Sequence, residues 1–212
     1  MDPDTPGAHR LRGWWQTTGK EAQTSSISAT SGGAMTGPSA TLEKIREEGT
    51  AAGLPGAPTV HLCTATIALF RSENALYKAC PTETCNKKVI DQGENFRCEK
   101  CNLDFPNYKY RLLGQVNIVD HTSQCWATAF SGEAEVIIGM TAQELGELMQ
   151  QSEGDYAAAF AGVPFQEFTF KLKTQMENYN DSLRLRSTIQ RVTQVNYRTY
   201  NKELLDMILE DK

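Results

Sequence analysis

Alternation of apolar and polar residues with a period of two, typical of strands with one buried face, runs through most of the chain after residue 58. It is clearest where Tyr110, Leu112 and the apolar residues after them alternate with charged and amide side chains. Five segments have this alternation or a run of β-branched and apolar residues, and we expect a strand in each: residues 60–70, 109–118, 124–130, 165–176 and 183–195. In the last segment the apolar phase slips between Ile189 and Val192, which predicts a β-bulge.

Helical spacing replaces this alternation in residues 133–160, between the third and fourth expected strands, with breaks near Gly139 and Gly154. Thr141, followed by Glu144 three residues later, is typical of a capping box at the start of a helix. The order of elements is therefore strand, cysteine-containing insert, two strands, helices and two strands. Because this is the order in an OB-type barrel, we expect a mainly β fold, with a five-stranded barrel and helices between its third and fourth strands.

A second helical pattern follows the last expected strand. Its apolar residues form one stripe, namely Tyr197, Tyr200, Leu204, Leu205, Ile208 and Leu209. The stripe comes after the barrel is complete, so this helix must cover either its own barrel or a partner. We therefore expect a barrel domain at residues 59–196, with the cysteine insert at 78–106, and a C-terminal helix at 197–212.

Residues 17–58 differ from the rest of the chain, since Ser, Thr, Gly, Ala and Pro dominate and no hydrophobic period is sustained. Such a composition buries too little apolar surface to offset the entropy lost on ordering, so we expect a linker. Within it, residues 39–48 could form a short charged helix, with Leu42 and Ile45 as its only apolar anchors. The adjacent tryptophans in residues 11–15 indicate the edge of another domain, so we assign residues 1–58 to a domain remnant and a linker.

The net charge of −5 is unusual for a nucleic-acid-binding protein, because basic side chains neutralise phosphate. Residues 131–163 contain six acidic residues and no Lys or Arg, and the rest of the chain has 21 basic residues against 20 of the 26 acidic ones. A local basic groove is therefore compatible with the sequence. No apolar stretch approaches the roughly 20 residues of a membrane span, and residues 1–10 lack the apolar core of a signal peptide. We expect no membrane association and a reducing, intracellular compartment.

Four of the six cysteines form two close pairs, C-x4-C and C-x2-C, with twelve residues between the pairs. They are Cys80, Cys85, Cys98 and Cys101. Four thiolates match the tetrahedral preference of Zn²⁺ and leave no open position on the metal, so we expect one structural zinc ion. The alternatives are two disulfides or four unrelated thiols, which a reducing compartment disfavours. Cys63 and Cys125 have no close partner in the sequence and are typical of small buried residues.

The expected strand at 124–130 contains the candidate binding residues. Because successive side chains alternate between the two faces, Cys125 and two alanines point one way, while Trp126 and Phe130 point the other. With the small residues in the barrel interior, the two aromatic rings project outward, at a spacing that we expect to suit stacking on successive unpaired bases. The alternation alone leaves open that both rings belong to the core, since aromatic residues are common in strands.

Basic residues near these positions are candidates for phosphate contacts. They are Lys87, Lys88, Arg97, Lys109 and Arg111. Taken singly, each is better explained as a solvated surface charge.

The cysteine insert and its flanks resemble the zinc-ribbon region of the replication protein A large-subunit family, on the sequence ACPTETCNKKVIDQGENFRCEKCNLDFPNYKYRL. The similarity continues through CWATAF and QVNYRTY, so it covers nearly all of residues 59–200. The early segment LRGWWQTTGK is similar to the end of the preceding OB domain of that family, followed by an interdomain linker. The chain therefore resembles a C-terminal fragment or a short form of the family.

The resemblance implies a protein that coats single-stranded DNA in replication, repair and recombination as part of a nuclear heterotrimer. It places the stacking aromatics of the family on Trp126 and Phe130, and the zinc ligands on the four paired cysteines. In the family, the C-terminal helix packs with helices of the middle and small subunits, which implies an interface at Tyr197, Tyr200, Leu204, Leu205 and Ile208. The competing hypothesis is a trimer-assembly module with weak or no direct DNA contact, because the preceding DNA-binding domains are absent from this chain.

Catalysis has little support in the sequence. His9, His61 and His121 are scattered, and no activated nucleophile is recognisable. A four-thiolate site also leaves the metal no position for a water molecule. We therefore expect a binding protein and not an enzyme.

Overall fold

The fold was analysed in a computed structural model, which describes residues 34–53, 57–180 and 182–210 and, before them, only positions 5, 8–10 and 12. The chain divides into two compact units, Met1–Gly33 and Ala34–Lys212. The adjacent tryptophans and most of the expected domain remnant lie outside the described residues. All strands among the described residues belong to the second unit.

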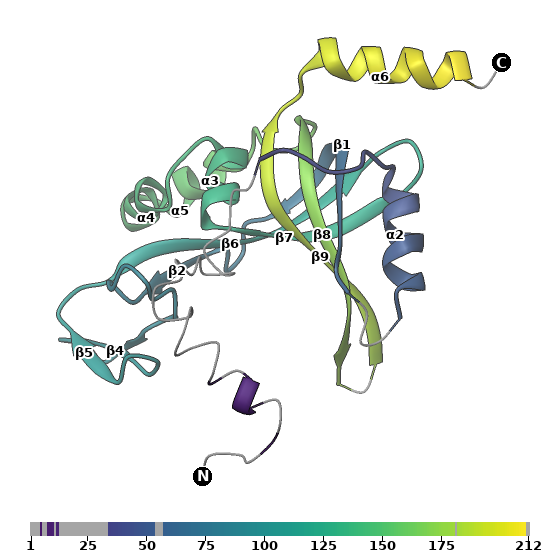
Figure 1. Ribbon diagram of the computed structural model, residues 1–212. Coiled ribbons are helices and arrows are strands. Elements are labelled where there is room, and N and C mark those ends of the chain that lie inside the picture. The colour runs from purple at the N-terminus through teal and green to yellow at the C-terminus, as the bar shows by residue number, and fades with distance from the viewer. Residues whose placement is uncertain are drawn as a thin grey trace. The chain divides into compact units, whose positions relative to one another are not determined.

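Five strands of the second unit form a closed barrel (Figure 1). They are β1 (Thr59–Arg71), β6 (Lys109–Val119), β7 (Gln124–Phe130), β8 (Glu167–Tyr179) and β9 (Ser182–Gln194). The order is β1-β8-β9-β7-β6, and pairing of β6 with β1 closes the ring. β7 and β9 are parallel, and the other neighbours are antiparallel. This is the OB order, and the five predicted strands are confirmed with ends within three residues.

Apolar side chains of alternate residues fill the barrel. On β8, Phe168, Phe170 and Leu172 point inward and are at most 1% exposed, because alternate positions of a strand share a face. Burial of each such side chain contributes about 1.5–3 kcal/mol. The predicted bulge in the last strand is confirmed, since Lys171 and Leu172 pair with Arg191 and Ile189 and skip the residue between them.

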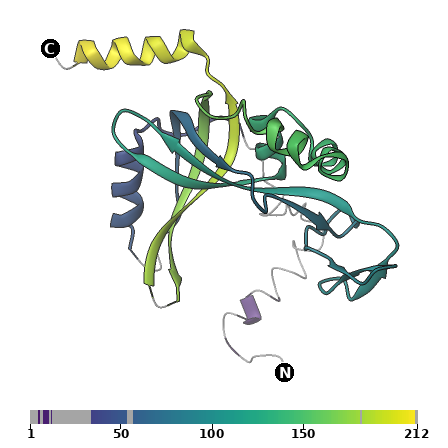
Figure 2. The same cartoon turned by 180° about the vertical axis from the view of Figure 1, so that it is seen from behind.

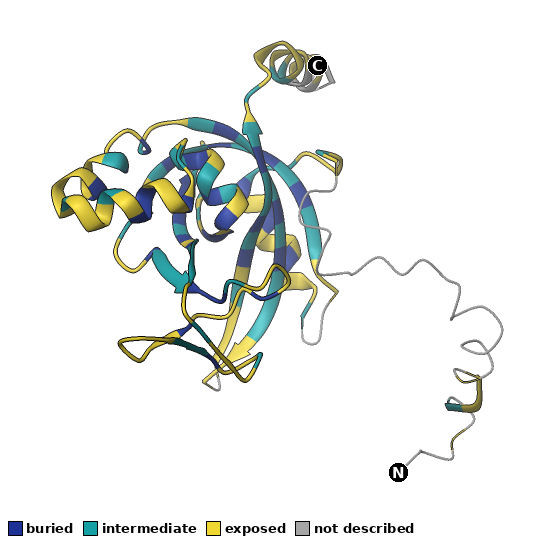
Figure 3. Ribbon diagram, turned by 90° about the vertical axis from the view of Figure 1, so that its left-hand side faces the viewer, coloured by how far each residue is buried: buried dark blue, intermediate teal, exposed yellow. Residues whose placement is uncertain are grey.

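Three helices connect β7 to β8 and present exposed outer faces (Figure 3). They are α3 (Ser131–Ile138), α4 (Ala142–Gln151) and α5 (Glu153–Ala159). Gly139 ends α3 with a φ of 78°, and Thr141 and Glu144 form the predicted capping box of α4. The second break comes at Ser152 and not at Gly154, because the Ser152 side chain accepts a hydrogen bond from Asp155 N and caps α5.

Residues 34–53 depart from the expected linker, because they pack on the barrel and belong to its compact unit. Helix α2 (Leu42–Ala51) contacts β8 and β1 on the opposite side of the barrel from α3–α5 (Figure 2). Leu42 and Ile45 are each 2% exposed, so these two apolar side chains are enough to pack α2 on the barrel. The chain before α2 also pairs with β1, where Leu62 N donates to Pro38 O at 2.9 Å. The compact domain thus begins near Ala34 and not at residue 59.

Strand β2 (Leu76–Ala79) pairs with β6. The cysteine insert lies between these two strands in the sequence and forms a small sheet of its own. Its strands are β3 (Ile90–Asp91), β4 (Phe96–Cys98) and β5 (Leu103–Phe105), paired in that order. The last helix, α6 (Tyr197–Glu210), follows β9. Among the described residues, no helix has the length and apolar character needed to cross a membrane.

Candidate metal centre and nucleic-acid interface

The four paired cysteines converge on one point in the ribbon. Their Sγ atoms all lie within 4.8 Å of one another, and the Cys80–Cys101 and Cys85–Cys98 distances are both 3.8 Å. A disulfide bond requires about 2.05 Å, whereas four sulfurs at 2.3 Å from a central zinc ion form a tetrahedron with edges of about 3.8 Å. All four cysteines are free. The arrangement therefore fits a tetrahedral metal site and not two disulfides.

Local turns and a few buried neighbours hold this cluster in place. Cys85 N donates to Thr82 O at 3.1 Å, and Asn102 has a φ of 54° in the turn after Cys101. Val89 is buried beside the thiols. Burial raises the pKa of Cys80, but hydrogen bonding with Thr82 outweighs burial and lowers this pKa to about 7. Hydrogen bonding with Cys85 instead raises the pKa of Cys101 to about 12. The cluster thus releases its protons unevenly, and metal binding must displace them.

Of the basic residues predicted in and beside the ribbon, some are held by contacts within the protein and others are exposed to solvent. Arg97 Nη1 lies 3.2 Å from both carboxylate oxygens of Asp104, and Lys109 Nζ donates to Thr82 O at 2.7 Å. These two side chains therefore stabilise the ribbon. Lys87 lies 3.9 Å from Glu99, a weak contact, and Lys88 is exposed with no ion pair among the described residues.

The outer face of β7 has the two candidate aromatics. Trp126 is 41% exposed and Phe130 is 47% exposed, while Ala127 and Ala129 point into the barrel and are at most 1% exposed. Neither ring is therefore part of the buried core. The two rings are four residues apart, about 13 Å along the strand at roughly 3.3 Å per residue. This is more than the roughly 3.4 Å rise between neighbouring stacked bases, so the rings form two separate stacking points and not one platform for adjacent bases.

Neighbouring strands extend this face, which we call the groove face. On β6, Leu113 lies opposite Phe130 and Asn117 lies opposite Trp126. Lys109 and Arg111 lie on the same face of β6 as Leu113, because alternate residues share a face. Of the predicted basic residues, Arg111 is thus the one nearest to the rings that has no ion pair among the described residues, whereas Lys109 is directed to the ribbon.

Arg71, at the end of β1, is a candidate that the sequence interpretation missed. Its guanidinium carbon lies 4.3 Å from the centroid of the Trp126 ring, a cation–π arrangement. Arg71 pairs with Gln115 of β6, whose amide donates to Thr128 on β7. The contact therefore depends on the pairing of three strands that are distant in sequence. A residue pattern along one strand contains no signal for it.

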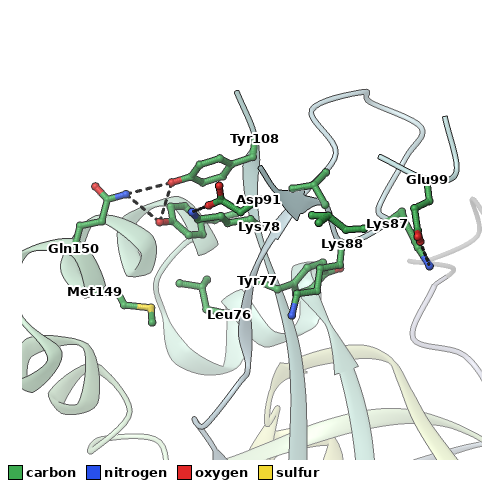
Figure 4. A pocket seen from close by; sticks show the side chains of 13 residues that line it. Leu76, Tyr77, Lys78, Lys87, Lys88, Asp91, Glu99, Tyr108, Met149 and Gln150 are labelled. Atoms are coloured by element: carbon green, nitrogen blue, oxygen red, sulfur yellow. Dashed lines mark hydrogen bonds and ion pairs between the residues drawn. The ribbon is translucent and has the colours of Figure 1, made fainter. Parts of the chain in front are cut away.

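A cleft of about 870 Å³ lies between the ribbon, β2 and α4 (Figure 4). On one wall, Gln150 Nε2 donates to the hydroxyls of Tyr108 and Tyr110 at 3.3 and 3.0 Å. Lys78 Nζ lies 2.8 Å from Asp91 and 4.8 Å from the centroid of the Tyr108 ring, and its hydrogen bond lowers the pKa of Asp91. The Gln150 hydrogen bonds thus join α4 to Tyr108 and Tyr110, and the Lys78–Asp91 pair joins β2 to the ribbon strand β3.

Helix α6 presents an apolar stripe without a cover among the described residues. Tyr197, Leu205 and Ile208 are 57–60% exposed, and the other two predicted interface residues, Tyr200 and Leu204, are half-buried. At the start of the helix, the Tyr197 hydroxyl donates to Glu167 of β8 at 3.0 Å, which joins α6 to the barrel. Such a stripe suits contact with further helices.

Comparisons with known proteins agree with this geometry. The model of the family described as replication factor-A C terminal domain matches residues 61–204. The replication protein A 70 kDa DNA-binding subunits of Drosophila melanogaster and Gallus gallus are each 39% identical, over 99% and 98% of this chain. The chain spans only about a third of their length, 35% and 34%.

Two solved structures have the same fold. A replication protein A heterotrimer bound to single-stranded DNA matches 97% of this chain and 48% of that chain, with a TM-score of 0.73 and 34% identity. Yeast replication protein A bound to single-stranded DNA matches 84% of this chain and 99% of that chain, with a TM-score of 0.69 and 26% identity. From the extent of the family match and these likenesses, the chain belongs to the family of replication factor-A C-terminal domains.

Proposed function

We propose that this chain binds single-stranded DNA as part of a replication protein A heterotrimer, in nuclear DNA replication, repair and recombination. The observation that carries the proposal is the groove face, where Trp126 and Phe130 stay half-exposed while small side chains fill the barrel beneath them. Support also comes from the relatives, which are DNA-binding subunits, and from the similar structures bound to single-stranded DNA.

The groove face suits unpaired bases for a physical reason. Each base that stacks on an aromatic ring contributes about 1–3 kcal/mol, with little dependence on base identity. Arg71 and Arg111 on the same face offer positive charge to the phosphates, so binding should weaken as the salt concentration rises. The net charge of −5 does not oppose this, since the excess acid lies in the helical segment after β7.

The four cysteines are proposed to hold one structural zinc ion. The 3.8 Å Sγ separations and the all-sulfur donor set support zinc in a closed tetrahedral site. Zinc bound there would hold the two ends of the ribbon together. Because four thiolates fill its coordination shell, the proposed role of the chain is binding and not catalysis.

The stripe on α6 is proposed to pack with helices of the middle and small subunits. Its exposed side chains, Leu205 and Ile208 among them, support an assembly role. By the same family likeness, residues 1–33 are proposed to be the end of a preceding domain with its linker. Deletion of the chain after Asn196 should abolish association with the other two subunits and leave the barrel folded. If association survived, the assembly role would be refuted.

A double variant, Trp126→Ala with Phe130→Ala, tests the DNA-binding role. It should weaken binding to a single-stranded oligonucleotide by about 2–6 kcal/mol, the loss of two stacking contributions. Fluorescence anisotropy with labelled single-stranded and duplex oligonucleotides, at two salt concentrations, measures the change. The matched control is Val136→Ala with Met149→Ala, which removes two apolar side chains of similar exposure, 53% each, from the helices. Equal affinity of the two double variants would refute the groove and favour a module for assembly alone.

A further inference from the structure

A shallow cleft of about 680 Å³ lies beside Trp126, at the loop that joins β6 to β7. Its wall consists of the loop residues Val119–Gln124, Trp126 and, from α2, Arg46. The cleft thus combines an aromatic ring, a guanidinium group and the loop hydroxyls of Thr122 and Ser123.

The loop and α2 are fixed to each other by hydrogen bonds. The carboxylate of Asp120 accepts from Leu42 N at 2.7 Å, from Thr122 N at 2.8 Å and from Ser123 N at 2.9 Å. Thr122 Oγ1 in turn accepts from Glu43 N at 3.2 Å. The negative charge of Asp120 is therefore engaged by the first N–H groups of α2 and of the loop. The position of Arg46 relative to Trp126 is set by this rigid junction.

Arg46 itself has only weak contacts. Its guanidinium lies 3.5 Å from Glu43 and 3.4 Å from Ser123 Oγ, and its side chain is 57% exposed. An exposed ion pair of this length contributes little to stability, so an incoming phosphate can replace it. Arg71, whose guanidinium lies over the Trp126 ring, does not line the cleft.

The cleft continues the groove face in one direction. Along β7, Phe130 lies nearer to the ribbon end of β6, and Trp126 lies nearer to the loop. The cleft comes next after Trp126, on the side where Figure 1 shows α2, away from the ribbon. A strand that stacks on Phe130 and then on Trp126 therefore reaches the cleft as it leaves the barrel.

We propose that this cleft is a nucleotide subsite, in which a base stacks against Trp126 and Arg46 binds the phosphate of a single-stranded nucleic acid. The subsite rests on the proposed function and adds to it a segment, α2, outside the barrel strands. Arg46 is there a binding residue for the sugar–phosphate backbone, and the Ser123 hydroxyl lies beside its guanidinium group at 3.4 Å.

The test compares Arg46→Gln with Lys44→Gln in the full chain. Both changes remove one positive charge from an exposed position of α2, but Lys44 does not line the cleft. In titrations with a single-stranded oligonucleotide at several salt concentrations, Arg46→Gln should lower the slope of log K against log salt by about 0.7 and the affinity by about fivefold at 0.1 M salt. Lys44→Gln should change neither, and Arg46→Lys, which keeps the charge, should retain the slope.

Three outcomes separate this subsite from the proposed function. A lower slope in Arg46→Gln alone, with unchanged thermal stability, supports the subsite. Equal slopes and affinities of the Arg46→Gln and Lys44→Gln variants overturn it. If the Trp126→Ala, Phe130→Ala variant still loses binding in that case, the proposed DNA-binding role of the groove face stands without the subsite. If the unaltered chain fails to bind single strands at any salt concentration, the proposed function falls, and the subsite with it.

Discussion

The ribbon and the barrel keep their folds by different means. In the barrel, large side chains such as Phe170 and Leu172 have no exposed surface, and a closed ring of paired strands surrounds them. In the ribbon, the strands are two or three residues long, and the buried residues are three of the cysteines and Val89. So small a sheet buries too little apolar surface to be stable alone, and the proposed metal, bound by its four thiols, would supply the difference. Apolar burial thus stabilises the barrel, whereas the proposed metal coordination would stabilise the ribbon.

Removal of the metal should have the largest effect on this contrast. Structural zinc sites of this type have apparent binding free energies of about 10–16 kcal/mol, so the Cys98→Ser variant should unfold the ribbon. Hydrogen exchange measured by mass spectrometry should then show fast exchange in β4 and β5 and unchanged protection in β1 and β8. The matched control is Cys63→Ser, a buried thiol outside the cluster, which should keep one metal per chain by native mass spectrometry. Equal loss of protection in both regions would show a single cooperative unit.

A cavity in the barrel should destabilise the barrel and leave the metal site of the ribbon unchanged. Phe170→Ala removes a fully buried ring and should lower the free energy of unfolding by about 3–5 kcal/mol. The metal content should stay at one per chain below the unfolding transition, because no ligand is changed. Phe165→Ala is the control, since Phe165 is 86% exposed and its loss should cost no more than about 0.5 kcal/mol. Similar unfolding midpoints for the two variants in urea would contradict the account of the core.

The smallest expected effect lies at the junction of α2 with the barrel. Burial raises the pKa of Asp120, but the hydrogen bonds from Leu42 N and Thr122 outweigh burial and lower this pKa below its ordinary value. The ionised carboxylate therefore adds stability above the ordinary pKa of about 3.9, and this stability is lost as the pH falls through the lower folded-state pKa. Asp120→Asn should cost about 2 kcal/mol at pH 7, the contribution of hydrogen bonds to a charged group.

Urea unfolding of both proteins between pH 7 and pH 2 measures this effect. The difference between Asp120→Asn and the unaltered chain should begin to shrink near pH 4 and vanish once the pH is below the lowered folded-state pKa of Asp120, because both side chains are then uncharged. Asp155→Asn is a control, because it neutralises an exposed carboxylate in α5 that is not part of the junction. A difference that stays constant down to pH 2 would show that the charge of Asp120 is unimportant.

Periodicity and cysteine spacing were sufficient to predict the barrel and the ribbon. A period of two reports directly which side of a strand is buried, so the strands and even the bulge between Ile189 and Val192 could be predicted. The docking of helix α2 could not, because the surfaces that bury it belong to β1 and β8, and the carboxylate that accepts from Leu42 N is Asp120, 78 residues away. A segment with two apolar anchors resembles a linker until its docking surface is known.

The candidate site was predictable to a lesser degree for the same reason. Outward projection of Trp126 and Phe130 follows from the small residues between them, and the structure has both rings half-exposed. Basic residues could be identified by type but not by their contacts, so Arg97 and Lys109 proved to be bound within the ribbon. Arg71 and Arg46 approach Trp126 from β1 and α2, through strand pairing and helix docking that no local pattern encodes.

The closed ring of strands has a consequence for how copies of this domain can crowd together. A strand with unpaired N–H and C=O groups invites another chain to add a strand, which leads to aggregation. Here β1 and β6 pair with each other, and β2 has the ribbon on its other side, where Val89 N donates to Lys78 O and Cys80 N donates to Lys87 O. Most of the ring therefore offers no open flank, but residues 175–179 and 182–186, in the outer part of the β8–β9 hairpin, pair with each other alone among the described strands and keep an open edge at which another strand could add.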